Sequence, residues 1–154
     1  MADHVTLKFK PEIAGEETVE NHEGQIELLS FQMGGGRSLD SSMLKGDSVP
    51  SNVDIQMSFS KSADKSSAPL WDAFLTGKRF DEAVIHVLRN TKDGGNDVSF
   101  ELTLQKVVIG SFSYSAMQGD SSRGSESFTL VAASMKGRAD KMDFSWDFLV
   151  NKKV

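Results

Sequence analysis

Apolar and polar residues alternate with a period of two along most of the chain. Successive side chains of a β-strand point to opposite faces, so this pattern predicts strands with one buried face. The clearest example runs from Val53 to Phe59, where apolar residues alternate with Asp54, Gln56 and Ser58. We expect these three polar side chains to face water.

Other segments also carry strand patterns. Residues 83–88 are almost continuously apolar and β-branched, which is typical of a strand covered on both faces. Within residues 100–109 the phase of the apolar positions shifts after Leu104, which indicates a β-bulge or two strands that run together. Further strand patterns lie at residues 5–9, 26–33, 128–132 and 142–150. The expected fold class is mainly β.

Residues 66–77 break the alternation and predict one short helix. Serines suited to an N-cap come first, and Pro69 fits the first turn because its missing N–H costs little there. Gly77 stands where a left-handed C-cap is expected. The segment therefore has both a start signal and a stop signal.

The apolar residues of this segment recur at helical spacing. Leu70 and Phe74 lie four residues apart, as do Trp71 and Leu75, so both pairs can share one apolar face. A helix of about three turns is marginally stable alone and depends on packing. We expect Leu70, Trp71 and Phe74 to anchor it to the sheet.

Length, charge and cysteine content narrow the class of protein. The 154 residues suit a single domain, residues 1–154, and the absence of cysteine excludes disulfides, thiolate metal sites and a cysteine nucleophile. A formal net charge of −5 is opposite to that of nucleic-acid binders, so we expect no nucleic-acid partner. No segment approaches the roughly 20 apolar residues of a membrane helix, and the first ten residues lack a signal-peptide core. We expect synthesis in the cytoplasm and no membrane insertion.

The serine motifs of the chain give weak support for catalysis. Ser58–Lys61 and Ser62–Lys65 match the Ser-x-x-Lys signature of penicillin-binding proteins, but the companion Ser-Asp-Asn and Lys-Thr-Gly elements are missing. Gly-Asp-Ser occurs at 46–48 and 119–121, yet no Asp-x-x-His partner follows either copy. We therefore expect no catalytic residue.

The histidines give equally weak support for a metal site. His22 stands near several glutamates, but the spacing fits no established zinc pattern. His86 lies in the middle of an apolar strand segment, where a structural role is the better interpretation. The glycines at 34–36 are followed by no phosphate-binding motif. We expect neither a metal nor a cofactor.

Collinear segments over nearly the whole chain resemble the haemolysin-coregulated protein (Hcp) family, whose members are tube subunits of type VI secretion systems. The most specific block is the central strand, helix and exit turn, at residues 59–61, 64–67, 69–70 and 76–80. Similar segments lie at 15–16, 22, 25–31, 100–111, 125–130 and 144–146. The family often has an aromatic Ser-Trp-Gly after the second strand, whereas this chain continues into three glycines at 34–36.

The resemblance implies a tail-tube-like antiparallel β-barrel of two packed sheets with one short flanking helix. It also implies six copies in a head-to-tail ring, and rings stacked into a hollow tube that a contractile sheath expels. Expected partners are other copies of the chain, a spike protein, sheath components and effector proteins chaperoned in the lumen. The chain then leaves the cell through the secretion system, without a signal peptide.

Two regions receive expected roles within such a tube. Asp54, Gln56 and Ser58 are candidates to line the lumen. The polar stretch 34–51 has the length of a functional or disordered loop, and we expect it to contact the next ring. Its candidate contact residues are Gly34, Gly35, Gly36, Arg37, Leu39, Met43 and Leu44.

Three alternatives stay open. A small β-barrel can enclose an apolar ligand, which predicts a monomer with a defined pocket. A serine hydrolase would use one of the weak serine motifs. A tube protein of a related phage-like contractile injection device would share the architecture of the secretion tube.

Overall fold

The computed structural model describes residues 4–19, 21–37, 41–46, 53–119, 123–150 and 152–153, and Met43 only in its backbone. The strands are β1 (His4–Lys10), β2 (Ile26–Leu28), β3 (Ser30–Arg37), β4 (Val53–Ser62), β5 (Arg79–Asn90), β6 (Asn96–Ser115), β7 (Ser125–Ala139) and β8 (Met142–Asp147). The helix α1 spans Ser67–Thr76, and a 3-10 turn, η1, spans Ser41–Leu44. No helix among the described residues is long and apolar enough to cross a membrane.

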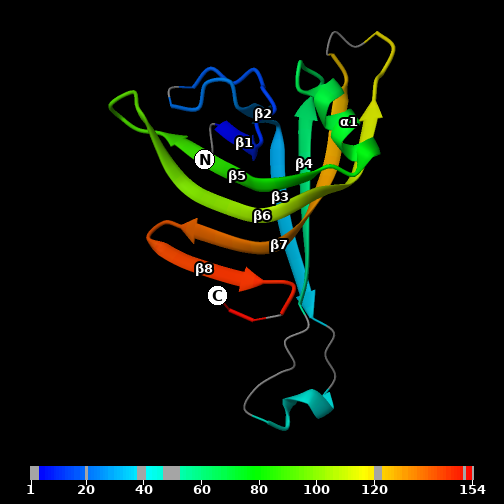
Figure 1. Cartoon of the computed structure of the whole chain (residues 1–154). Coiled ribbons are helices and arrows are strands. Elements are labelled where there is room, and N and C mark those ends of the chain that lie inside the picture. The colour runs from blue at the N-terminus through cyan, green and yellow to red at the C-terminus, as the bar shows by residue number, and fades with distance from the viewer. Residues whose placement is uncertain are drawn as a thin grey trace.

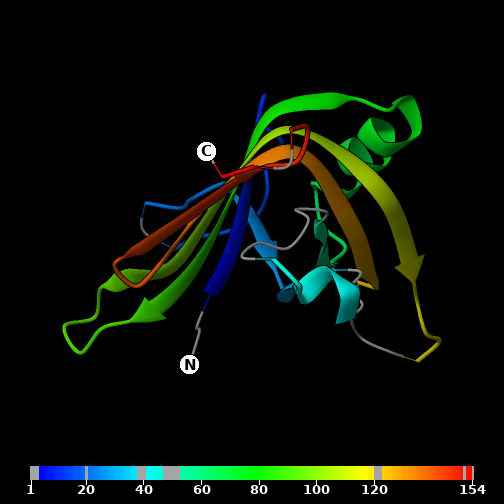
Figure 2. The ribbon, with the colours of Figure 1, turned by 90° about the horizontal axis from the view of Figure 1, so that it is seen from below.

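All eight strands belong to one antiparallel sheet with the order β2-β1-β5-β6-β7-β4-β3, and β8 pairs with β7. The sheet curls into a half-barrel (Figures 1 and 2). Only Leu29 separates β2, which pairs with β1, from β3, which pairs with β4. The segment from β2 to β3 bends at Leu29 and therefore connects the first and the last strand of this order. The mainly β, antiparallel prediction with one short helix is confirmed, although the strands form one continuous sheet.

The sheet bends where its three longest strands share an irregularity. Lys106 of β6 has a left-handed backbone with φ of 54°, and the ladder is interrupted there opposite Asp81 and Ala133. Leu104 before the bend and Val107 after it both point into the core, and no residue is inserted between them, because the pairs on either side of Lys106 keep the same register. The phase shift seen in the sequence is thus an irregularity inside one continuous strand.

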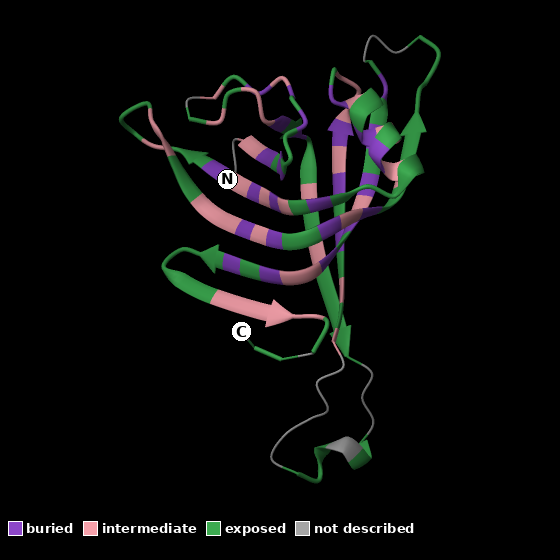
Figure 3. Cartoon of the chain, in the orientation of Figure 1, coloured by how far each residue is buried: buried purple, intermediate pink, exposed green. Residues whose placement is uncertain are grey.

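The concave side of the sheet is filled by stacked phenylalanines. Phe112, Phe128, Phe59 and Phe31 stand directly opposite one another on β6, β7, β4 and β3. Their ring centroids are 5.6, 5.0 and 5.1 Å apart in that order. Phe31 then lies 6.2 Å from Phe100, across the curl. Figure 3 shows the resulting alternation of buried and exposed positions along the strands.

Helix α1 packs against the end of β6. Leu70 is fully buried, and the half-buried Trp71 ring lies 4.4 Å from that of Phe112. Phe74 is also half-buried and contacts both rings. Leu75 is 74% exposed, so the expectation that it shares the buried face is wrong. The cause is the helical turn, which points position 75 to solvent.

The two ends of the helix differ in how they are capped. Gly77 adopts the expected left-handed conformation, and its N–H donates to the carbonyl of Phe74. Ser66 has a helical backbone and makes no side-chain cap. Its hydroxyl donates instead to the carboxylate of Asp64. The serine at this position therefore belongs to a network beneath the helix.

Several expected element boundaries need correction. Gly34–Arg37 belong to strand β3, because all four pair with β4, so the loop starts later than expected. Strand β5 alternates between buried and half-buried residues, and only one of its faces lies fully in the core. The C-terminal strand ends at Asp147, and residues 148–150 form a turn.

Candidate functional site

The three predicted lumen residues share the outward face of β4. Asp54, Gln56 and Ser58 are exposed, and they alternate with the buried Met57 and Phe59. Strand pairing places Ser58 between Gln32 of β3 and Thr129 of β7. The polar face expected from the sequence therefore continues onto neighbouring strands.

Hydroxyl groups cover this outward face across four strands. Direct cross-strand neighbours hydrogen-bond through their side chains: Ser30 with Ser60 at 2.6 Å, Ser111 with Thr129 at 2.8 Å, Ser113 with Ser127 at 2.6 Å and Ser115 with Ser125 at 3.1 Å. We call Ser30, Ser58, Ser60, Ser111, Ser113, Ser115, Ser125, Ser127 and Thr129 the hydroxyl face. The members of this face carry no charge.

The other half of the outward side is chemically different. Beyond the bend at Lys106, the same side of β1, β5, β6, β7 and β8 carries charges of both signs. They include Lys8, Glu82, Glu101, Lys136, Arg138 and Asp143. Arg138 lies 3.7 Å from Asp143 on the neighbouring strand. The bend thus separates the uncharged hydroxyl face from a surface that carries charges of both signs.

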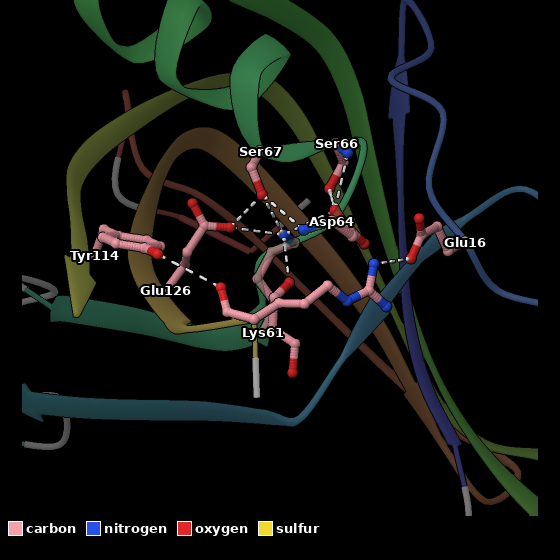
Figure 4. A network of polar contacts seen from close by, with 9 residues as sticks. Glu16, Lys61, Asp64, Ser66, Ser67, Tyr114 and Glu126 are labelled. Atoms are coloured by element: carbon pink, nitrogen blue, oxygen red, sulfur yellow. Dashed lines mark hydrogen bonds and ion pairs between the residues drawn. The ribbon is translucent and has the colours of Figure 1, made fainter. Parts of the chain in front are cut away.

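A buried ionic network lies beneath the start of α1 (Figure 4). The Lys61 ammonium is fully buried and donates to Glu126 Oε1 at 2.9 Å and to Asp64 Oδ1 at 3.0 Å. The hydroxyl of Ser67, the first residue of the helix, donates to Glu126 Oε1 as well. The network joins β4, β7 and the helix start through charge-assisted hydrogen bonds.

Protonation of this network is governed by its hydrogen bonds. Burial alone raises the pKa of the Asp64 carboxyl, but hydrogen bonds from Ser66 and Lys61 outweigh it and hold that pKa below its usual range. Asp64 is therefore ionised at neutral pH. Two carboxylates face one ammonium, and Glu126 Oε2 has no hydrogen-bond partner within the described part of the chain.

The sequence contains a signal for this buried ionic network. Lys61 lies two residues after Phe59 and therefore points to the same buried face of its strand as Met57 and Phe59. Glu126 lies two residues before Phe128 and likewise shares its buried face. A charged residue in the apolar phase of a strand is either unpaired, which is costly, or paired with an opposite charge. Two in-phase charges of opposite sign on different strands therefore predict an ion pair.

The candidate serine nucleophile is separated from its candidate base. Ser58 is exposed on the outward face, whereas Lys61 is buried on the concave side. Residues three apart on a strand point to opposite faces, so this pair does not form a Ser-Lys dyad. Both Gly-Asp-Ser copies have their Asp and Ser outside the described residues.

The three histidines all lie at or against the segment 11–25. His86 Nε2 is 3.3 Å from Glu101 Oε2, and its ring lies 4.9 Å from that of His22. Burial lowers the pKa of His86 most, and the attraction of Glu101 offsets this only in part. His4 Nδ1 is 3.7 Å from Glu17 Oε2. Among the described residues, no group of three or more histidine, aspartate or glutamate side chains is placed to hold a metal ion.

The residues expected in the inter-ring loop fall into three groups. Gly34, Gly35, Gly36 and Arg37 are exposed in β3. Leu44 is 64% exposed in η1, which extends beyond the ends of β3 and β4 in Figure 1. Leu39 and the side chain of Met43 lie outside the described structure.

Comparisons with known proteins agree with this architecture. The model of the family described as type VI secretion system effector, Hcp, matches residues 6–138. No curated protein matches the chain. A solved structure described as a type six secretion system protein has a TM-score of 0.84 at 19% identity, covering 98% of this chain and 99% of that one.

Two further solved structures resemble the chain over nearly their whole length. Hcp1 from Salmonella typhimurium has a TM-score of 0.79 at 21% identity and is matched over 100% of both chains. A mutant of Hcp1 from E. coli EAEC 042 pathovar has a TM-score of 0.77 at 18% identity, covering 94% of this chain and 97% of that one. These likenesses show a common fold, and the family match spans most of the sequence. The chain belongs to the Hcp family, the tube-subunit family of type VI secretion systems.

Proposed function

We propose that six copies of this chain associate head to tail into a ring, that the rings stack into a secretion tube, and that the hydroxyl face lines the lumen. Effector proteins are carried in this lumen. The spike protein and the sheath are the other partners within the machine, and the chain leaves the cell with the expelled tube. Its function is structural, with no reaction to catalyse.

The observation that carries this proposal is a pair of free strand edges on the part of the sheet that carries the hydroxyl face. Strand β3 is the last strand of the order and, among the described residues, pairs only with β4. In β6, Val108 is the last residue paired with β5, and residues 109–115 pair only with β7 within the described structure. A free edge is a ready template for another strand.

The direction of the strands makes these two edges compatible. The order β6-β7-β4-β3 is antiparallel throughout, so β3 and β6 run in opposite directions. Placing β3 of one copy beside β6 of the next therefore continues the antiparallel alternation. Because the two edges differ, the contact is head to tail, and such contacts close into a ring when the rotation permits. The hydroxyl faces then form one continuous surface.

The contact between rings is assigned to the connection between β3 and β4. Within the described structure, residues 53–56 of β4 pair only with β3, because pairing with β7 starts at Met57. The hairpin thus projects beyond the sheet, and η1 lies farther out with Leu44 exposed. An exposed leucine at the end of a projection suits contact with a neighbouring ring.

Electron microscopy and light scattering of the purified chain test the ring. Six-fold rings are the expected result, and a compact monomer at high concentration would overturn the proposal. Replacing residues 38–52 with a short glycine-serine linker is expected to leave hexamers intact and to abolish tubes. Loss of the hexamer would contradict the assignment of this loop to stacking.

Single cysteines test the lumen assignment, because the chain has no cysteine of its own. Gln56→Cys and Ser58→Cys are expected to react slowly, in assembled rings, with a maleimide too bulky to enter. Gln105→Cys, at an exposed position on the charged part of the outward side, is the control and should react freely. Full reactivity at positions 56 and 58 in intact rings would exclude them from the lumen.

A further inference from the structure

The projecting hairpin carries a groove whose floor has no side chains. The groove has a volume of about 850 Å³ and is lined by Gln32, Gly34, Gly35, Gly36, Val53, Asp54, Gln56 and Ser58. It adjoins the hydroxyl face at Ser58. We call it the glycine trough. Its volume is in the range of ligand-binding clefts.

Within the described part of the chain, two of the three glycines have no neighbour that would require a glycine. A Cβ atom on Gly35 would lie 2.5 Å from Cδ1 of Ile55, the end of a side chain that would have to move to admit it. A Cβ atom on Gly34 or Gly36 would meet nothing within 4 Å, and neither residue has a positive φ. Glycine weakens a strand, and in a strand it often marks the close approach of another backbone or a ligand.

The walls of the trough offer groups suited to a peptide backbone. Gln56 stands directly opposite Gly34, and Asp54 stands opposite Gly36. Gln32 lies on the same exposed face of β3, two residues before Gly34. The side-chain carboxamides of Gln32 and Gln56 each provide both a hydrogen-bond donor and an acceptor, as a peptide group does. Asp54 is the one charged residue among the described residues that line the trough.

We propose that the glycine trough binds an extended, cationic segment of a carried polypeptide. The backbone of the segment lies over Gly34 and Gly36 and hydrogen-bonds to Gln32 and Gln56. A lysine or arginine of the segment pairs with Asp54. This inference rests on the proposed function, since it assigns to one part of the lumen a class of cargo sequence.

Fluorescence anisotropy of assembled protein tests the trough with two defined probes. One is a fluorescein-labelled decapeptide of glycine and serine with two lysines, and the other carries two glutamates in their place. The lysine peptide should bind at least tenfold more tightly than the glutamate peptide at low salt. Asp54→Asn should remove this difference. Equal binding of the two peptides to the unmodified chain would overturn the proposal.

Side chains added to the floor provide the second test. Gly36→Val and Gly34→Val are each expected to weaken binding of the lysine peptide at least tenfold, with no fall in the urea midpoint, because valine favours strands and the space is open. Ala139→Val, at an exposed position of β7, is the matched control. Unchanged binding by both glycine variants would overturn the proposal.

Two further measurements separate a failure of the trough from misfolding of a variant and from a failure of ring assembly. Gln56→Ala removes an exposed side chain without touching the core, so a several-fold loss of binding supports the trough even if a glycine variant misfolds, and unchanged binding contradicts it. Rings are scored by electron microscopy on the same preparations. Rings without peptide binding would overturn the trough alone, whereas absence of rings would overturn the proposed function.

Discussion

Phe59 of β4 stands directly opposite Phe128 of β7, with ring centroids 5.0 Å apart and ring planes inclined by 10°. Both side chains are about 1% exposed. This pair lies at the centre of the row formed by Phe112, Phe128, Phe59 and Phe31, and it holds the part of the sheet that carries the hydroxyl face to the core. The stability of the proposed tube wall therefore depends on it.

Phe128→Ala is expected to lower the free energy of unfolding by about 3–5 kcal/mol, because it removes a buried ring and leaves a cavity between two stacked neighbours. Urea denaturation followed by circular dichroism measures the change. Val131→Ala is the control on the same strand, since Val131 is 62% exposed, and it should cost less than about 0.5 kcal/mol. Similar losses in both variants would contradict the assigned core face.

Leu70→Ala and Leu75→Ala make the same chemical change on opposite sides of α1. Leu70 is fully buried and Leu75 is 74% exposed. The first substitution should therefore cost about 2–5 kcal/mol, and the second less than about 0.5 kcal/mol. Denaturant midpoints compare the two directly. A costly Leu75→Ala in the isolated subunit would show that the face of the helix is wrongly assigned.

Lys61→Met should destabilise the chain by about 3–5 kcal/mol, because Asp64 and Glu126 are left as uncompensated buried acids. Lys61→Met combined with Glu126→Leu is expected to recover part of this loss, since the second change removes one of those acids. Lys65→Met is the control, because Lys65 is exposed. Equal stability of the single and the double variant would show that Lys61 and Glu126 are not coupled.

Acidification should weaken the network through Asp64. The folded-state pKa of Asp64 lies below the unfolded value of 3.8. Its stabilising contribution is therefore complete above that value and is lost as pH falls through the folded-state pKa. The free energy of unfolding of Asp64→Asn should depend less on pH in this range than that of the unmodified chain. An unchanged acid transition would contradict this role.

His86 should impose a second pH dependence at higher pH. Its folded-state pKa lies below the ordinary value of 6.5, so the unfolded chain binds the proton more readily. Stability from this source is complete above 6.5 and falls as pH drops below it. Unfolding free energies at pH 7.5 and 5.5 should thus differ more for the unmodified chain than for His86→Gln. The reverse order would contradict the sign of the shift.

The sequence predicted most elements because alternation is a local property. Val53–Phe59, the apolar phase shift after Leu104 and the stop signal at Gly77 each correspond to a feature of the fold. The boundaries that failed did so for non-local reasons. Gly34–Arg37 have weak strand propensity, and only pairing with β4 makes them a strand.

The polar site could be predicted only strand by strand. Asp54, Gln56 and Ser58 were identified from one alternating segment, but the hydroxyl face needs Thr129 and Ser111 from strands far apart in the sequence. Register decides which residues become neighbours, and the register of distant strands cannot be deduced from a single local pattern. The Lys61–Glu126 pair was missed for the same reason, although each residue carried a local signal.

The sequence by itself therefore determined the β class, the helix, the outward phase of β4 and the resemblance to the Hcp family. Only the tertiary structure decided that one bent sheet carries an uncharged hydroxyl face and a surface with charges of both signs, that β3 and β6 present free edges, and that Gly34 and Gly36 leave a trough bare. The physical reason is the range of the interactions. Alternation and capping act within a few residues, whereas sheet order, edges and surface neighbours arise from contacts between distant segments.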